Sequence, residues 1–199
     1  MKTGVIILAA GSSSRLGEAK QLLEIQGEKL IDRSIKAAQK IAANRTVVVL
    51  GANAELIQKS IKSEVSSIVI NSEWKDGMGS SIVAGLRFLI EKEFIDQVIL
   101  MLCDQPFVDE ELLIRLIQKQ SQTLQGIIAS SYSGTLGVPA LFGKKYFEEL
   151  LALHGHEGAK NLIRKHSEDV AFIDFPLGKI DLDTPHDVEE FLKNYDSEA

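Results

Sequence analysis

The feature of this sequence that most restricts its fold is a set of short apolar segments that lack polar alternation. Strands covered on both faces have this composition, because neither face of the strand meets water. Between the segments, apolar residues recur three and four positions apart, which is typical of amphipathic helices. Strands that alternate with helices predict an α/β fold with a mostly parallel sheet and helices on both faces. The predicted strands are Val5–Leu8, Val47–Leu50, Ile68–Ile70, Val98–Leu102 and Ile127–Ala129.

Helices are predicted from the apolar spacing, and two helix starts carry capping residues. Asp109 precedes Glu110 and Glu111, and Thr184 precedes Pro185. An Asp or Thr side chain can accept a hydrogen bond from the first helical turn, and proline suits the first position of a helix. We therefore expect helices to begin just after Asp109 and Thr184. The helical apolar residues are Ile31, Ile35, Ala38 and Ile41, then Ile82, Leu86, Leu89 and Ile90, then Leu112, Leu113, Leu116 and Ile117.

Length, charge and cysteine content exclude several classes of protein. With 199 residues, 45% of them hydrophobic, the chain can form one domain with a sizeable core. The net charge of −6 argues against nonspecific nucleic-acid binding, which needs a basic surface. No apolar run approaches the roughly 20 residues that cross a bilayer, and no secretion signal is visible, so we expect neither membrane insertion nor export. Cys103 is the only cysteine, which excludes an internal disulfide and agrees with a cytoplasmic location.

A loop of small residues directly after the first predicted strand has the composition of a phosphate site. It contains Gly11 and Ser12–Ser14, followed by Arg15 and Lys20. Glycine and serine let backbone N–H groups approach an anion, and the two basic side chains supply positive charge for phosphate oxygens. We therefore expect this loop to bind phosphate, with an ordinary serine-rich turn as the alternative.

Two well-known phosphate loops do not match this segment. A P-loop needs Gly-Lys-Ser/Thr five residues after its first glycine, whereas Leu16, Gly17 and Glu18 stand at that distance from Gly11. A dinucleotide fingerprint needs glycines at its first, third and sixth positions, and only the first is present. The loop therefore belongs to another class of phosphate site.

Asp104 is a candidate metal ligand at the same edge of the sheet. It follows the predicted strand Val98–Leu102, and ligands gather at the carboxyl ends of strands in open sheets of this type. Mg²⁺ prefers oxygen ligands and commonly takes one or two carboxylates beside substrate phosphates. Asp104 therefore suits Mg²⁺, and a turn before Pro106 is its alternative role.

Several segments resemble those of the nucleotidyltransferases that act on molybdenum cofactor, within the broader sugar-nucleotide pyrophosphorylase-like fold. The matches cover nearly the whole chain, from Leu8 to Asp187. The form Asp104-Gln105-Pro106 is closer to the cytidylyltransferase branch of this family than to its guanylyltransferase branch. The matching segments are Leu8–Lys20, Asn71–Leu86, Leu102–Pro106, Gly137–Phe142, Gly155–Lys160 and Lys179–Asp187.

The predicted catalytic residues are Lys20, Arg15 and Asp104. The resemblance implies that Asp183 shares a Mg²⁺ ion with Asp104, and two carboxylates at one site would otherwise repel each other. Asp181 is the less favoured ligand, and Thr184 can cap a helix while Asp183 binds metal. The predicted nucleotide contacts are Ala9, Ala10, Gly11, Ser12, Arg15, Lys20, Asn71, Gly79 and Ser80.

The Asn71 segment keeps two interpretations. A helix start at Gly79 and Ser80 can present donors to a base or a ribose, and Asn71 follows a predicted strand. The same residues also suit plain helix capping, with Trp74 as a packing residue. Both interpretations stay open at this point.

The acceptor side departs from the family pattern. Candidate acceptor contacts are Gln105, His156 and Lys160. The family commonly has an acidic residue and an arginine where this chain has His156 and Lys160, which puts the acceptor in doubt more than the nucleotide chemistry. The predicted organisation is one domain over residues 1–199, with a nucleotide-binding part at about 1–106, an acceptor-binding part at about 107–190 and a frayed tail at 194–199.

The predicted reaction is transfer of a nucleotide from CTP to a phosphate. No Ser-His-Asp arrangement is recognisable, so the acceptor phosphate should attack the α-phosphorus directly and release pyrophosphate. The resemblance implies molybdopterin cofactor as the acceptor, with a molybdoenzyme or its chaperone receiving the product. Ala10 stands where the guanylyltransferase branch has a second glycine, which favours CTP over GTP. The alternatives are GTP use, a sugar- or polyol-phosphate nucleotidyltransferase, and a noncatalytic protein that binds a nucleotide or a cofactor.

Overall fold

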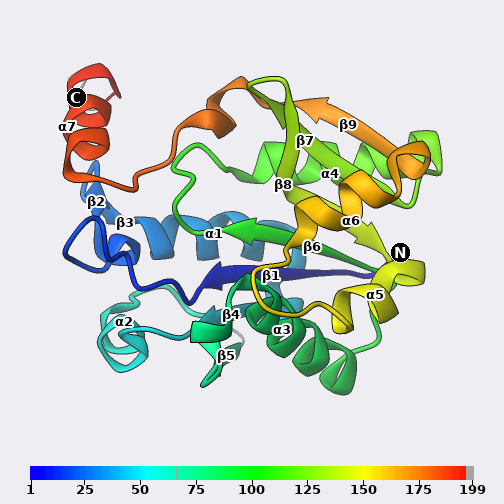
Figure 1. The fold of residues 1–199 in the computed structure, drawn as a ribbon, viewed down its shortest axis with the longest axis horizontal. Helices are drawn as coiled ribbons and strands as arrows, with labels where there is room; N and C mark the ends of the chain where they lie inside the picture. Colours follow the sequence, from blue (N-terminus) through cyan, green and yellow to red (C-terminus); the bar gives the residue numbers. More distant parts are fainter. Residues whose placement is uncertain (66, 196–199) are drawn as a thin grey trace.

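A seven-stranded sheet lies at the centre of the computed structural model, which describes residues 1–65 and 67–195 (Figure 1). The strand order in these residues is β5-β4-β1-β6-β8-β7-β9, and only the pairs that include β8 are antiparallel. The predicted α/β fold with a mostly parallel sheet is confirmed. The strands of the sheet are β1 (Thr3–Ala9), β4 (Thr46–Leu50), β5 (Ser67–Ile70), β6 (Gln97–Leu102), β7 (Ile127–Tyr132), β8 (Thr135–Gly143) and β9 (Val170–Asp174).

Every predicted strand is present, and two further strands complete the sheet. β8 runs antiparallel between β6 and β7, and β9 forms the edge beside β7. β8 contains Gly137 and Pro139, residue types that weaken strands, and its pairing with β7 shifts register after Ala129, as in a β-bulge. β9 is a short edge strand whose apolar pattern is incomplete. Both strands therefore lack the signal that identifies the others.

Helices cover both faces of the sheet, as predicted (Figure 1). On one face, Ile35 of α1 and Leu113 of α4 share a core with Ile7 of β1. On the other face, Leu86 of α3 packs in a core with Ile6 of β1. Successive residues of β1 thus enter opposite cores, which explains its unbroken apolar run. The helices are α1 (Leu30–Ala42), α2 (Ala54–Ser60), α3 (Met78–Lys92), α4 (Glu110–Thr123), α5 (Phe147–Leu151), α6 (Ala159–Lys165) and α7 (Pro185–Tyr195).

α7 packs beside a small hairpin at the carboxyl edge of the sheet rather than on a sheet face (Figure 1). The hairpin consists of β2 (Glu24–Ile25) and β3 (Glu28–Lys29). Phe191 of α7 and Leu182 are buried with Ile25 in a third apolar cluster. This cluster anchors the segment before α7 at the edge of the sheet where β1 and β6 end.

Both predicted helix caps are confirmed. Asp109 Oδ1 accepts a hydrogen bond from the N–H of Leu112 at 2.8 Å, where α4 begins. Before α7, Thr184 Oγ1 accepts from the N–H of Asp187 at 3.2 Å, and Asp187 Oδ2 accepts from the N–H of Thr184 at 2.7 Å. This reciprocal pair is a capping box.

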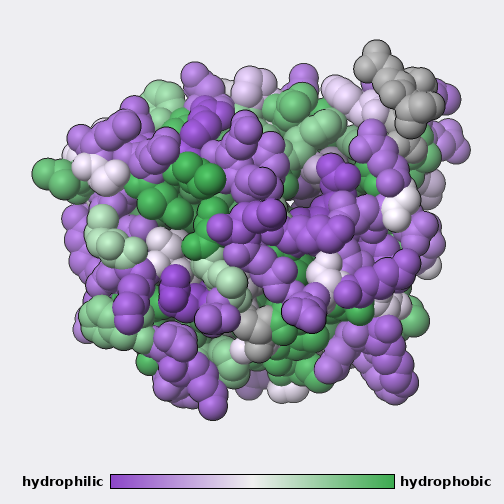
Figure 2. Space-filling view, turned by 180° about the vertical axis from the view of Figure 1, so that it is seen from behind, coloured by the Kyte–Doolittle hydropathy of each residue, from purple (hydrophilic) through white to green (hydrophobic). Residues whose placement is uncertain are grey.

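The face opposite to that of Figure 1 is mostly hydrophilic, with smaller hydrophobic groups between the polar residues (Figure 2). No helix in the described part of the chain is both long and apolar enough to cross a membrane. Asn194 and Tyr195, the first residues of the predicted frayed tail, belong to α7. Residues 196–199 of that tail lie outside the described residues.

Candidate active site

The loop after β1 is held at its base by Gln21. This side chain is almost fully buried, and its Nε2 donates hydrogen bonds to the carbonyl oxygens of Ala9 at 2.9 Å and Gly11 at 3.0 Å. Ser13 has a positive φ of 53°, and its hydroxyl oxygen accepts from the backbone N–H of Lys20 at 3.1 Å. These contacts fold the loop back and place Lys20 at the carboxyl edge of the sheet.

Lys20 lies among three carboxylates that come from distant segments. Its Nζ is 2.5 Å from Asp104 Oδ2, 2.6 Å from Asp183 Oδ1 and 3.8 Å from Asp181 Oδ1. Asp104 is the second residue after β6, and both other aspartates lie between a short 3₁₀ helix, η6 (Pro176–Lys179), and α7. The structure therefore brings together Lys20, Asp104 and Asp183, which the sequence analysis assigns to the reaction centre.

Burial and mutual interaction set the charges of this cluster. Burial alone lowers the pKa of Lys20, but the carboxylates of Asp104 and Asp183 outweigh it and hold that pKa above its ordinary value. Burial and the charge of Asp104 raise the pKa of Asp181 to about 6, against the opposing effect of Lys20. Lys20 is therefore a charged ammonium at neutral pH, as a phosphate-binding lysine must be.

The three carboxylates can hold a divalent cation. One oxygen from each of Asp104, Asp181 and Asp183 lies within 4.8 Å of the other two. Oδ1 of Asp104 is buried and has no hydrogen-bond partner in the described part of the chain, although buried carboxylate oxygens are normally paired. Hard cations take oxygen ligands of this kind. The donor set fits a divalent metal, and Asp181 lies beside the two predicted ligands.

Arg15 lies at the exposed end of the same loop. Its Nη1 is 3.3 Å from Asp183 Oδ2, and its side chain is 76% exposed. The Lys20 side chain is only 14% exposed. An exposed ion pair such as that of Arg15 contributes little to stability. The guanidinium of Arg15 is thus open to solvent and able to meet a phosphate group.

A cavity of about 490 Å³ opens beside the charged cluster. Asp104, Asp181 and Asp183 lie on its wall together with the β1 loop. This arrangement places a chamber large enough for a small-molecule ligand next to Lys20. The predicted nucleotide contacts that line it are Ala9, Ala10, Gly11, Ser12 and Lys20.

Trp74 completes the wall of this cavity through a close approach at Gly51. A Cβ at Gly51 would lie 2.8 Å from the carbonyl oxygen of Ala10 and 2.5 Å from Trp74 Cβ, so only glycine fits there. Neither Trp74 nor Gln21 is assigned to the site by sequence reasoning. Their contacts join segments far apart in the chain, and no local pattern identifies such contacts.

Asn71 organises the start of α3. Its Nδ2 donates to Ser80 Oγ at 2.9 Å and to Ser81 Oγ at 3.0 Å. The N–H of Gly79 donates to the carbonyl oxygen of Gly155 at 3.2 Å. The carbonyl of Gly155 thus caps the first turn of α3, whereas the Asn71 amide binds serine hydroxyls. Ser81 lines the cavity, and the three predicted residues do not. Nucleotide contact by Asn71, Gly79 and Ser80 stays a prediction.

The predicted acceptor contacts lie in different places. His156 lines the cavity. Gln105 is buried, and its Nε2 donates to the carbonyl oxygens of Val138 and Gly178, at 3.2 Å each. Gln105 therefore ties the end of β6 to the segment before Asp181. Lys160 is exposed on α6 and does not line the cavity.

His156 reaches the cavity because two backbone segments touch. Gly77 has a φ of 111°, and a Cβ there would overlap the carbonyl oxygen of Gly155. Glycine alone permits both this backbone conformation and this approach. The loop that carries His156 is consequently packed against the start of α3.

Cys103 adds no nucleophile to this site. The thiol is buried, and burial raises its pKa well above the usual range. A thiol in this state is mostly protonated at neutral pH and unreactive. The residue acts as part of the core.

Comparison with known proteins identifies the class to which this fold and site belong. The model of the family described as "MobA-like NTP transferase domain" matches residues 5–170 of this chain. Because that match covers most of the chain, the protein belongs to the MobA-like NTP transferase family and is a nucleotidyltransferase of that family.

Two curated relatives resemble parts of the chain. "Nicotine blue oxidoreductase" of Paenarthrobacter nicotinovorans is 35% identical over 116 residues, which are 58% of this chain and 55% of that protein. "Purine catabolism protein PucB" of Bacillus subtilis is 28% identical over 171 residues, which are 80% of this chain and 79% of the relative. The first relative is matched over only about half of its length.

A solved structure agrees with the complete fold. The crystal structure of Rv0371c from Mycobacterium tuberculosis H37Rv has a TM-score of 0.80 and 26% identity, and the match covers 98% of this chain and 99% of that one. A second structure of Rv0371c, in complex with manganese, also has a TM-score of 0.80, at 23% identity over 98% of this chain and 100% of that one.

Proposed function

We propose that this protein transfers CMP from CTP to the terminal phosphate of molybdopterin cofactor and releases pyrophosphate, with Mg²⁺ as the metal. The observation that carries the proposal is the meeting of Lys20, Asp104 and Asp183 beside the cavity lined by the β1 loop. Nucleotidyl transfer needs a fixed positive charge and a metal site at the reacting phosphate. The motif resemblance supports molybdopterin as the acceptor.

Each charged residue has its own part in this reaction. An oxygen of the acceptor phosphate attacks the α-phosphorus of CTP, a new P–O bond forms, and the bond to the β-phosphate breaks as pyrophosphate leaves. Lys20 neutralises charge at the α-phosphate, and Arg15 binds the departing phosphates. Asp104 and Asp183 would hold the metal, which would supply positive charge to neutralise charge on the phosphate oxygens. No general base is required, because the acceptor phosphate is already ionised.

Ala10 supports CTP as the nucleotide. It lines the cavity, and its carbonyl oxygen accepts a hydrogen bond from the N–H of Ala52 at 3.0 Å, which fixes the backbone at this point. A methyl group here leaves less room beside the backbone than glycine would. The smaller one-ring pyrimidine is therefore favoured over a two-ring purine.

Parallel assays of pyrophosphate release with molybdopterin cofactor and Mg²⁺ test the proposal. We expect a kcat/KM for CTP at least about tenfold above that for GTP, equivalent to roughly 1.4 kcal/mol. Ala10→Gly should narrow the difference. Equal or better use of GTP would contradict the base assignment alone, whereas no pyrophosphate release from either triphosphate would contradict the acceptor.

A further inference from the structure

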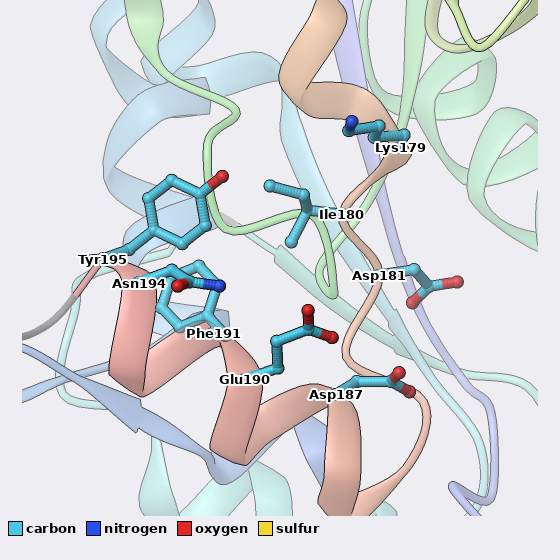
Figure 3. Close-up of a pocket in the computed structure, with 8 residues that line it drawn as sticks. All are labelled: Lys179, Ile180, Asp181, Asp187, Glu190, Phe191, Asn194 and Tyr195. Atoms are coloured by element: carbon cyan, nitrogen blue, oxygen red, sulfur yellow. The ribbon is translucent and has the colours of Figure 1, made fainter.

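A second cavity, of about 310 Å³, lies between α7 and the segment that leads to Asp181 (Figure 3). Asp181 lines both this cavity and the larger one beside Lys20. The two cavities are therefore neighbours at the carboxylate cluster. An acceptor whose phosphate lies at Lys20 can extend its other end into the second cavity.

Aromatic side chains form one side of this second cavity. Phe191 and Tyr195 line it, with ring centroids 5.3 Å apart and planes inclined by 32°. Phe107 contacts the Tyr195 ring edge-on, with a centroid distance of 5.0 Å. The Tyr195 ring is thus supported by two aromatic neighbours, yet the residue is 39% exposed. A supported and exposed ring is a stacking surface for a planar ligand.

Polar side chains next to these aromatic rings can form hydrogen bonds with groups at the edge of a planar ligand ring. Glu190 and Asn194 project from α7 into the space below Ile180 (Figure 3). In the described part of the chain, the Glu190 carboxylate has neither a hydrogen bond nor an ion pair with another residue. A carboxylate accepts hydrogen bonds from adjacent N–H groups, and an amide can both donate and accept. These groups suit a heterocycle that carries amino and ring N–H donors.

The charge around the second cavity decides which end of the acceptor enters it. Asp181, Asp187 and Glu190 line it with the basic residue Lys179, and of these three acidic side chains that of Glu190 points into the space below Ile180 (Figure 3). An acidic surface repels a phosphate and tolerates an uncharged ring. The carboxylates of the first cavity are offset by Lys20 and by the metal that they would hold, whereas those of the second cavity are offset by Lys179 alone among its lining residues. The phosphate of the acceptor is therefore directed to Lys20, and the uncharged ring to the α7 side.

We propose that the α7 cavity binds the pterin ring of the acceptor, with Tyr195 stacked on the ring and Glu190 accepting hydrogen bonds from its amino and ring N–H groups. This inference rests on the proposed function, because it assumes a pterin phosphate as the acceptor. It makes α7 the specificity element of the acceptor side.

A phosphate-free pterin tests the cavity without catalysis. 6-Hydroxymethylpterin is fluorescent, and its titration with the full chain measures binding directly. We expect saturable binding by the unaltered protein and a Kd raised about tenfold or more by Glu190→Gln and by Tyr195→Ala, from loss of a charged acceptor and of the stacking ring respectively. Tyr195→Phe should retain binding, because it keeps the ring.

Glu189→Gln is the matched control. It removes the same charge from the neighbouring position of α7, but Glu189 does not line the cavity, so its Kd should be unchanged. Circular dichroism checks that each variant is folded. Absence of saturable binding, or equal binding by Glu190→Gln and the unaltered protein, would overturn the inference.

Steady-state kinetics separate this inference from the proposed function. Glu190→Gln should raise the KM for molybdopterin and leave the KM for CTP unchanged. If the unaltered protein transfers CMP to molybdopterin but Glu190→Gln leaves both KM values unchanged, the α7 assignment is wrong and the function stands. If no transfer to molybdopterin occurs at all, the proposed function itself is wrong.

Discussion

The two ends of the β1 loop carry the same charge in different surroundings. At the inner end, Lys20 is 14% exposed and lies 2.5 Å from Asp104 and 2.6 Å from Asp183. At the outer end, the Arg15 side chain is 76% exposed, and its Nη1 lies 3.3 Å from Asp183 Oδ2. A buried ammonium between carboxylates is held in place, whereas an exposed guanidinium is free to reorient.

This difference in exposure implies that Lys20 and Arg15, on the same loop after β1, have different roles in the reaction. Preorganised charge stabilises a transition state, because it costs no reorganisation when the reaction occurs. A mobile exposed charge contributes mainly to capture of the ligand. We therefore assign Lys20 and its carboxylates to turnover and Arg15 to triphosphate binding.

The largest loss of activity should follow from removal of a carboxylate that lies beside Lys20. Asp104→Asn and Asp183→Asn should each lower kcat/KM for pyrophosphate release by about 10³-fold, through loss of a metal ligand. The double variant should be little worse than either single one, because both residues serve one cation. Strictly additive losses, or full activity in EDTA, would argue against a shared metal.

Removal of the ammonium itself comes next. Lys20→Ala should lower kcat by about 10²- to 10³-fold, the scale for loss of one preorganised charge donor. Lys59→Ala, which removes an exposed lysine of α2, is the matched control and should leave kcat unchanged. A well-folded Lys20→Ala protein with normal turnover would refute the division between inner and outer ends.

Substitution of Arg15, at the outer end, should change the affinity for CTP more than it changes kcat. Arg15→Ala should weaken CTP binding by about tenfold, or roughly 1.4 kcal/mol, with a smaller change in kcat. Calorimetric titration with CTP measures the affinity apart from turnover. If the affinity is unchanged while kcat falls as far as in Lys20→Ala, the two ends act as one unit.

The fold was predictable where burial leaves a local signal. Strands β1, β4 and β6 are covered on both faces, so their apolar runs are continuous. β8 breaks that pattern, because Gly137 and Pro139 lie within it and its pairing with β7 shifts register there, with the extra residues on β8 between Gly137 and Ala140. Pairing with both neighbours, rather than propensity, makes this segment a strand, and pairing partners cannot be read from one segment alone.

The site was predictable to the extent that its residue types are themselves informative. Lys20 and Asp104 follow strands at the carboxyl edge, where charged residues indicate a ligand site. Asp183 was placed by the motif resemblance, not by its chemistry. The hydrogen bonds of Gln21 and the approach of Trp74 to Gly51 depend on tertiary distances, and the sequence contains no local sign of them.

Asp181 is less closely associated with Lys20 than Asp104 and Asp183 are, and its substitution tests whether it belongs to the same catalytic cluster. It is within 4.8 Å of the other carboxylates, but it is 3.8 Å from Lys20 and its side chain is 51% exposed. Asp181→Asn removes a charge that repels Asp104 and leaves the closer pair intact. We expect kcat/KM to fall by less than about tenfold, since a longer and more exposed interaction is weaker. The same pyrophosphate assay measures it, and a loss as large as that of Asp183→Asn would make Asp181 a third metal ligand.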